Sequence, residues 1–131
     1  MGEEKKYELN LLTELSEKDI EVIQTMEKNY PQTTSSFKHY LLEEYIVFCK
    51  KQSDYGTGNI AVGTQLKTIK EIMVSLEGVW FRMNDKMQRL FNIILIKETL
   101  EANNESVEDS YRDLAVYSKI ARVVKSGMWA K

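Results

Sequence analysis

The stretch from residue 105 to residue 124, ESVEDSYRDLAVYSKIARVV, decides how this chain is organised. In a helix, residues four apart lie on one face, so Glu105, Asp109 and Asp113 form one stripe. The stripe continues into three apolar side chains, those of Val116, Ile120 and Val123. An ordinary amphipathic helix would carry Leu or Val where the two aspartates stand. Because an unpaired buried charge is costly, we expect these carboxylates to meet either a metal ion or Lys and Arg side chains of another helix.

The composition predicts one globular all-α domain over residues 1–131. Hydrophobic residues make up 43% of the 131 residues and charged residues 29%, which is far from the composition of disordered chains. One Pro and six Gly are too few for a turn-rich β fold, and no long strand-like alternation occurs. The predicted fold class is therefore all-α, a compact bundle of about five helices.

The net charge and the cysteine content limit the classes of binding partner and the cellular compartment that the sequence predicts. A net charge of −2 gives no electrostatic basis for binding nucleic acid directly, although a small nucleotide ligand is compatible with a local basic cluster. The lone Cys49 excludes an internal disulfide and favours a reducing compartment. The polar start MGEEKKYELN and the absence of a run of ~18 apolar residues predict a cytoplasmic protein with no membrane association.

Local signals place the helices. Residues 1–15 are predicted to be a partly ordered arm, and Ser16 is a good N-cap for a helix over residues 17–29 that ends at Tyr30-Pro31. A second helix is expected from about residue 34 to residue 52, followed by a Gly-rich turn over residues 53–60. Two more helices are expected, one from about residue 63 and one from residue 79 to about residue 98, and Gly78 before the second either breaks the first helix or allows close packing. Their predicted core residues are Leu66, Ile69, Ile72, Met73, Leu76, Val79, Met83, Met87, Leu90, Phe91 and Ile94.

The end of the chain carries an apolar tail. Trp129 follows Gly127, which is a good residue for ending a helix in the left-handed conformation. Such a tail often docks on a neighbouring subunit, so we expect a homo-oligomer, a dimer or larger.

The acidic residues form a candidate magnesium site. Glu44 lies near an apolar face of its helix, as Asp113 does, and hard divalent ions prefer carboxylate oxygens. The predicted metal ligands are Glu44, Glu105, Asp109 and Asp113. The alternative is that acids in a first turn stabilise the helix by charge alone, which explains Glu105 and Asp109 but not Asp113, two turns further along.

The basic residues form a candidate phosphate site. Arg82, Lys86 and Arg89 are spaced over two helical turns and share one edge, and Arg is a good bidentate phosphate donor. The alternative is a solvated helix face on which Asp85 and Arg89 pair weakly.

Three motifs together resemble a known family. They are Lys51-x-x-Asp54-Tyr55-Gly56-x-x-Asn59, Arg82-x-x-Asp85-Lys86-x-x-Arg89-Leu90-x-Asn92 and Glu105-Ser106-x-Glu108-Asp109-x-x-x-Asp113-Leu114-x-x-Tyr117. Their order and spacing over residues 40–125 resemble the nucleotide modification associated domain 1 family of phages and prophages. That family is similar in layout to the all-α nucleoside triphosphate pyrophosphohydrolases of the MazG and dimeric dUTPase type.

The resemblance implies a metal-assisted reaction at a nucleotide. Glu44, Asp109 and Asp113 would be catalytic and, with Glu105, would hold magnesium at the phosphates. Arg82, Lys86 and Arg89 would neutralise charge on the phosphates, and Asp54, Tyr55 and Asn59 would line the base or sugar. The expected function is a magnesium-dependent (deoxy)nucleoside triphosphate pyrophosphohydrolase linked to nucleotide modification or pool control. The alternative is a non-catalytic helical module that binds a nucleotide or a protein and whose acids and basic residues form an internal Asp–Arg network. A third possibility is a structural subunit whose apolar helices mainly support oligomerisation.

Overall fold

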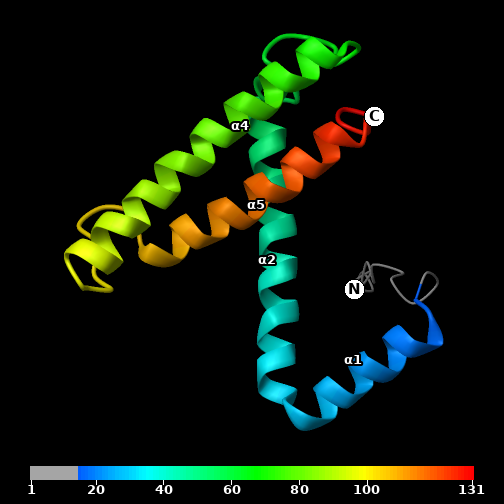
Figure 1. The fold of residues 1–131 in the computed structure, drawn as a ribbon, viewed down its shortest axis with the longest axis vertical. Coiled ribbons are helices and arrows are strands. Elements are labelled where there is room, and N and C mark those ends of the chain that lie inside the picture. The colour runs from blue at the N-terminus through cyan, green and yellow to red at the C-terminus, as the bar shows by residue number, and fades with distance from the viewer. Residues whose placement is uncertain (1–14) are drawn as a thin grey trace, which may run out of the picture. The chain divides into compact units, whose positions relative to one another are not determined.

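The computed structural model describes residues 15–131, and within this range the chain is all-α, as the sequence predicts. Figure 1 shows the elements in order: α1 (Glu17–Asn29), α2 (Pro31–Tyr55), the short α3 (Gly58–Ala61), α4 (Ile69–Leu90), the π-helical segment η2 (Phe91–Ile96) and α5 (Val107–Lys125). The described residues contain no β-strand. The predicted arm falls, up to residue 14, outside the described range.

The chain divides between Leu41 and Leu42 into two compact units. The first unit contains α1 and the beginning of α2, and the second contains the remainder of α2 and every later element. The prediction of one domain over residues 1–131 stays a prediction. All residues of the candidate site belong to the second unit. Across residues 15–131, no helix combines the length and the apolar character needed to cross a membrane.

The first two helices follow from their caps. α1 has the predicted bounds, because the Ser16 side chain accepts a hydrogen bond from the Asp19 N–H at 3.1 Å. α2 starts at Pro31 instead of near Thr34. Proline suits the first position of a helix, where its missing N–H costs nothing and its fixed φ is already helical. The same Tyr30-Pro31 pair therefore ends one helix and begins the next.

The prediction of two helices over residues 63–98 is wrong, because α4 is a single helix that runs through Gly78. Its true beginning is a capping box. The Thr68 Oγ1 accepts from the Glu71 N–H at 3.1 Å, and a Glu71 carboxylate oxygen accepts from the Lys67 N–H at 3.4 Å. A glycine inside a helix costs only about 1 kcal/mol relative to alanine, which a 22-residue helix tolerates.

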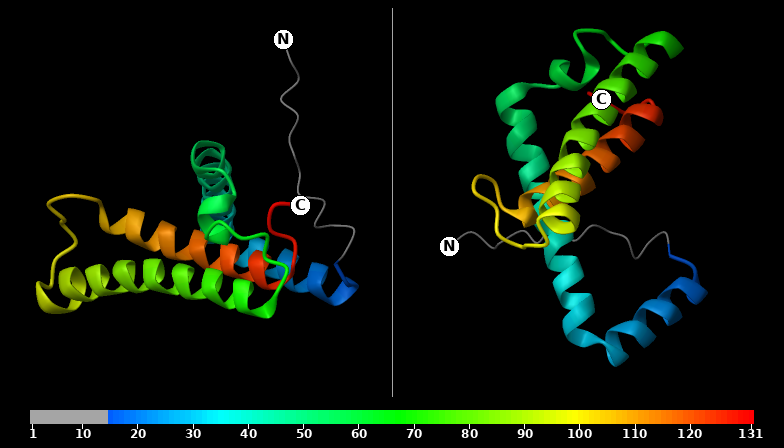
Figure 2. Two further views of the ribbon diagram at one scale, coloured as in Figure 1. Left: turned by 90° about the horizontal axis from the view of Figure 1, so that it is seen from above. Right: turned by 60° about the vertical axis from the view of Figure 1, so that its left-hand side comes forward.

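The hydrophobic core lies between α3, α4 and α5, and α4 and α5 form an antiparallel pair (Figures 1 and 2). Its buried members are Ile60, Ala61, Val79, Val116, Ile120, Val124 and Trp129. The predicted core face of α4 is only partly correct. Met87 and Phe91 are exposed, and Ile93 is buried where Ile94 was expected. The wider π-helical turn of η2 shifts the register of the apolar residues, which explains the last difference.

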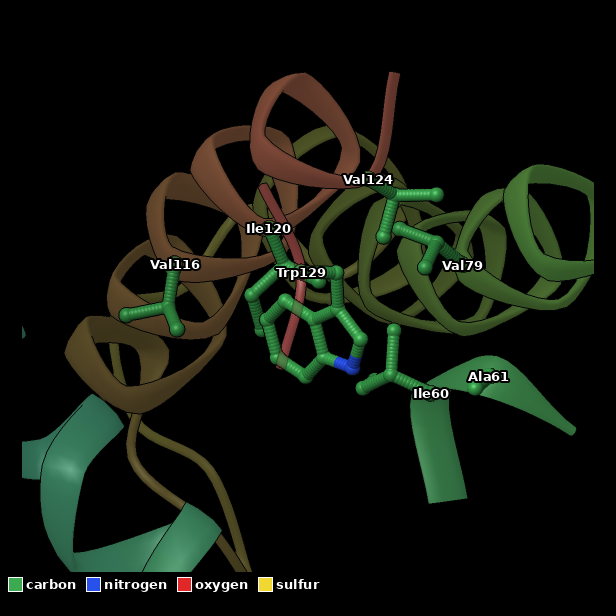
Figure 3. Close-up of a cluster of buried hydrophobic side chains, with 7 residues drawn as sticks. All are labelled: Ile60, Ala61, Val79, Val116, Ile120, Val124 and Trp129. Carbon is green, nitrogen blue, oxygen red and sulfur yellow. The ribbon is translucent and has the colours of Figure 1, made fainter. Parts of the chain in front are cut away.

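Trp129 of the C-terminal tail packs on its own chain, and the predicted docking of the tail on a neighbouring subunit stays a prediction. Trp129 is 7% exposed, and Figure 3 shows its ring beside Ile120 of α5 and Ile60 of α3. Its Nε1–H donates to the Thr57 carbonyl at 3.0 Å, and the ring meets Phe48 of α2 edge-on at 6.0 Å. The tail therefore holds α3 and the end of α2 against α5.

Replacing this ring tests the role of the tail. We expect Trp129→Ala to lower the free energy of unfolding by roughly 3–5 kcal/mol, because it removes a large buried side chain and a hydrogen bond. Urea unfolding followed by circular dichroism measures the change. The matched control is Leu100→Ala, whose side chain is 79% exposed. Equal effects of the two substitutions would show that the tail does not belong to the core.

Candidate functional site

Asp113 is a buried carboxylate on the inner face of α5. It is 6% exposed and shares this face with the buried residues Ser110, Val116, Ile120 and Val124. The prediction that Asp113 lies within the apolar arc of its helix is therefore confirmed.

Three cations surround the Asp113 carboxylate. Oδ1 lies 3.4 Å from Lys51 Nζ of α2 and 3.8 Å from Arg112 Nη2 of α5, and Oδ2 lies 3.2 Å from Lys86 Nζ of α4. The predicted partners for this charge are thus Lys and Arg, two of them from other helices. One side chain joins α2, α4 and α5.

The other predicted metal ligands also pair with cations. Glu44 binds Lys119 at 2.7 Å, and Glu105 binds Lys86 at 3.0 Å. Asp109 pairs with Arg112 at 3.4 Å. Ser106 is the N-cap of α5 and accepts from the Asp109 N–H, so the first-turn explanation fits Asp109.

These contacts do not build a magnesium site. Among residues 15–131, no three His, Cys, Asp or Glu side chains gather where they could hold one ion. The arrangement of Glu44, Glu105, Asp109 and Asp113 does not fit the ion that the family resemblance implies, because each carboxylate is already neutralised by a different set of cations. Their contacts with Lys and Arg resemble the internal Asp–Arg network that the sequence predicts as the alternative to a metal site. Magnesium binding stays a prediction.

The three basic residues of α4 have different surroundings. Arg89 donates to the Ser106 carbonyl at 3.2 Å and to Ser110 Oγ at 2.6 Å, and it also bonds the Glu105 carbonyl. Arg89 therefore fastens the beginning of α5 to α4. Lys86 lies between Glu105 and Asp113.

Arg82 is the exception. Its Nη2 donates to Asn59 Oδ1 at 3.2 Å, which is a neutral acceptor. Within the described part of the chain, no carboxylate oxygen lies within 4.0 Å of its guanidinium.

A cavity of about 280 Å³ opens beside Arg82, and we call it the α2–α5 pocket. It is lined by Lys51, Gln52, Tyr55, Asn59, Ile60, Arg82, Asp113, Val116, Tyr117 and Ile120. The structure thus brings together Tyr55, Asn59, Arg82 and Asp113, which the sequence places in three separate motifs. The remaining predicted site residues lie outside the lining: Glu44, Asp54, Lys86, Arg89, Glu105 and Asp109.

Besides the apolar Ile60, Val116 and Ile120, three lining residues were not among the predicted site residues: Lys51, Gln52 and Tyr117. Lys51 had a signal, because it shares a helix edge with the partly buried Glu44, and Tyr117 closes the third motif. Gln52 had none. Its Oε1 atom is buried and has no hydrogen-bond partner in the protein. An amide oxygen left unpaired in this way is recognisable only in three dimensions.

The loop that carries Asn59 is anchored on both sides. Ser75 of α4 is buried and donates to the Ile60 carbonyl at 2.6 Å, and Trp129 donates to the Thr57 carbonyl. Asn59 lies between these two anchors. The wall of the α2–α5 pocket is therefore fixed by the core and not by the loop alone.

Lys86 is held in its charged form. Burial by itself lowers the pKa of Lys86, but hydrogen bonds to Glu105 and Asp113, together with the charges of both carboxylates, outweigh burial. The net result is a pKa above the ordinary 10.5. Lys86 therefore stays charged through the neutral range.

Removing the charge of Asp113 tests the network. We expect Asp113→Asn to lower the free energy of unfolding by roughly 3 kcal/mol, because the substitution leaves three neighbouring cations without their shared carboxylate. Urea unfolding at neutral pH measures this loss. Glu101→Gln is the control: Glu101 is exposed, so its replacement should cost less than about 0.5 kcal/mol. A loss for Asp113→Asn as small as that of the control would contradict a structural role.

The raised pKa of Lys86 gives a pH dependence. The charged form of Lys86 stabilises the folded state, so its contribution is complete below pH 10.5 and is lost as the pH rises through the folded pKa. We expect the stability difference between the native protein and Lys86→Met to be full at about pH 8 and to shrink towards about pH 11. Urea unfolding of both proteins at each pH measures it, and the difference cancels the titration of other groups. A constant difference would refute the assignment.

Comparison of the chain with protein-family models, with curated proteins and with solved structures finds no match to any of them. Function therefore has to be inferred from the geometry of the site.

Proposed function

We propose that this chain binds a mononucleotide in the α2–α5 pocket. One observation carries the proposal. The pocket combines two cations, Lys51 and Arg82, with the aromatic rings of Tyr55 and Tyr117 and with an unpaired amide acceptor on Gln52. The cations suit a phosphate, the aromatic rings suit a base, and the amide acceptor suits a hydroxyl or amino group of the ligand.

Arg82 supports the phosphate assignment. Its guanidinium contacts only a neutral acceptor among the described residues, so it retains donors that a phosphate can use in bidentate fashion. Lys51 adds a second positive charge at the same pocket, although it also serves Asp113. With one carboxylate and two cations on the lining, the pocket has an excess of positive charge for an anionic ligand.

The tyrosines support the base assignment. Tyr55 at the end of α2 lines the pocket and is 69% exposed, so most of this residue is open to a ligand. Tyr117 of α5 lines the same pocket and is half-buried. Aromatic rings provide surfaces on which a base can stack, worth about 1–3 kcal/mol for each base in nucleic-acid complexes.

Gln52 supports a ligand that donates hydrogen bonds. A buried amide oxygen without a partner costs about 1–3 kcal/mol, and if the Gln52 side chain turns towards the pocket that it lines, a ligand hydroxyl or amino group removes this cost. The volume limits the ligand's size. About 280 Å³ is near the lower bound of ~300 Å³ for small-molecule pockets, which favours one nucleotide over a dinucleotide.

The proposal is for binding and not for a reaction step, because the candidate catalytic carboxylates are engaged by cations. The magnesium-dependent pyrophosphohydrolase that the family resemblance implies remains the competing proposal. The two differ in one measurable respect, which is whether magnesium changes the fate of a nucleoside triphosphate.

The test is calorimetric titration of the full chain with nucleoside mono-, di- and triphosphates, with the matching nucleosides and with pyrophosphate, each with and without magnesium. We expect at least one nucleotide to bind without magnesium. Arg82→Gln should weaken that binding about 10- to 150-fold, because a charge-assisted hydrogen bond contributes about 1.5–3 kcal/mol. Arg122→Gln, at an exposed position of α5, is the matched control and should leave the affinity unchanged.

A further variant separates the contact to the base or sugar from the contact to the phosphate. Gln52→Met keeps the size of the side chain and removes the acceptor, so it should weaken binding of the nucleotide and leave binding of pyrophosphate unchanged. Failure of every compound to bind, or equal effects of the two arginine substitutions, would refute the proposed pocket. Magnesium-dependent release of pyrophosphate from a triphosphate would instead favour the enzyme.

A further inference from the structure

A stripe of exposed apolar side chains runs along one flank of α4, roughly 80–100° around the helix from its buried residues Val79 and Leu90. It consists of Ile69, Met73, Trp80, Met87 and, at the first position of η2, Phe91, which are between 50% and 79% exposed. With about 100° between successive helical residues, all five positions fall within an arc of about 40°. Because all five residues are at least half exposed, no described segment of the chain covers the stripe. The sequence pattern assigns four of these five residues to the core of a bundle, and a single unit leaves all five uncovered.

The spacing of the stripe is symmetric. Trp80 lies midway between Met73 and Met87 in the sequence, and it also lies midway between Ile69 and Phe91. An antiparallel second helix related by a two-fold axis at Trp80 would therefore set each Met73 against a Met87 and each Ile69 against a Phe91. Every position of the stripe then meets a large apolar side chain and none meets a charge.

We propose that α4 pairs with α4 of a second copy of this chain, antiparallel and about a two-fold axis at Trp80. A self-complementary patch of this kind forms a closed dimer, because each copy offers the other the same surface. The proposal is independent of the ligand, because the α2–α5 pocket is lined from other faces of the helices.

The buried area is sufficient for a dimer. At least half of each stripe side chain is exposed, so covering the five side chains buries roughly 500 Å² on each copy, given the size of aromatic and long apolar residues. The sum over both copies is about 1,000 Å², where specific interfaces begin. Phe81, which is 62% exposed and packs edge-on against Trp80 at 5.1 Å, enlarges the patch.

The oligomeric state of the full chain tests the interface. Sedimentation over a wide range of concentration should give a species of about twice the 15.3 kDa of one chain. Trp80→Glu places two like charges at the axis and should weaken the dimer at least tenfold while the circular dichroism stays helical. Tyr111→Glu is the matched control, an aromatic residue of α5 that is 55% exposed, and it should leave the dimer intact. A native protein that remains monomeric, or a dimer unaffected by Trp80→Glu, would overturn the proposal.

A charge pair tests the orientation. Met73→Lys and Met87→Glu should each weaken the homodimer, because each sets a charge against a methionine. An equal mixture of the two variants should form a heterodimer, since one Met73→Lys then faces one Met87→Glu and the remaining two methionines face each other. In a parallel pairing, position 73 faces position 73, and mixing gives no such recovery. The antiparallel register would be overturned by the following pair of results. Trp80→Glu disrupts the dimer, but the mixture of Met73→Lys and Met87→Glu forms no heterodimer.

Discussion

The second unit depends on one buried carboxylate. Asp113 contacts Lys51 of α2 and Lys86 of α4, and it is the side chain at which the three long helices of this unit meet. Around it, Glu43 and Glu44 of α2 reach Arg112 and Lys119 of α5, so ion pairs hold much of α2 in place. Between α4 and α5, in contrast, most contacts are apolar. The unit thus combines an apolar helix pair with a third helix attached largely by charge.

The attachment of α2 by ion pairs affects the α2–α5 pocket, because one lysine takes part in both. Lys51 belongs both to the network around Asp113 and to the lining of the α2–α5 pocket, so an anion that draws Lys51 towards itself removes part of the Asp113 shell. Lys86 and Arg112 remain to neutralise the carboxylate. The proposed binding of an anionic ligand would therefore be coupled to the attachment of α2 through one ammonium group.

Sequence reasoning recovered what local physics determines. The Ser16 cap, the all-α class and the burial of Asp113 follow from side-chain hydrogen bonds and helical periodicity. The wrong bounds predicted for α4 also have local causes. Gly78 does not interrupt a long helix, and the capping box at Thr68 marks the true beginning of α4.

The partners of the charged residues could not be predicted, because they depend on how helices pack. Periodicity placed Asp113 on an inner face but did not specify whether Lys51, Lys86 or a metal would face it. The two tryptophans illustrate what such packing decides: Trp129 is 7% exposed in the core, and Trp80 is 58% exposed on α4. Since the chain has only these two, the native fluorescence of a single copy combines a shielded emitter with a solvated one, and the proposed dimer would shield the second as well. A soluble quencher reaches them unequally, so an unlabelled sample carries separate optical reporters for the core and for the outer surface of α4.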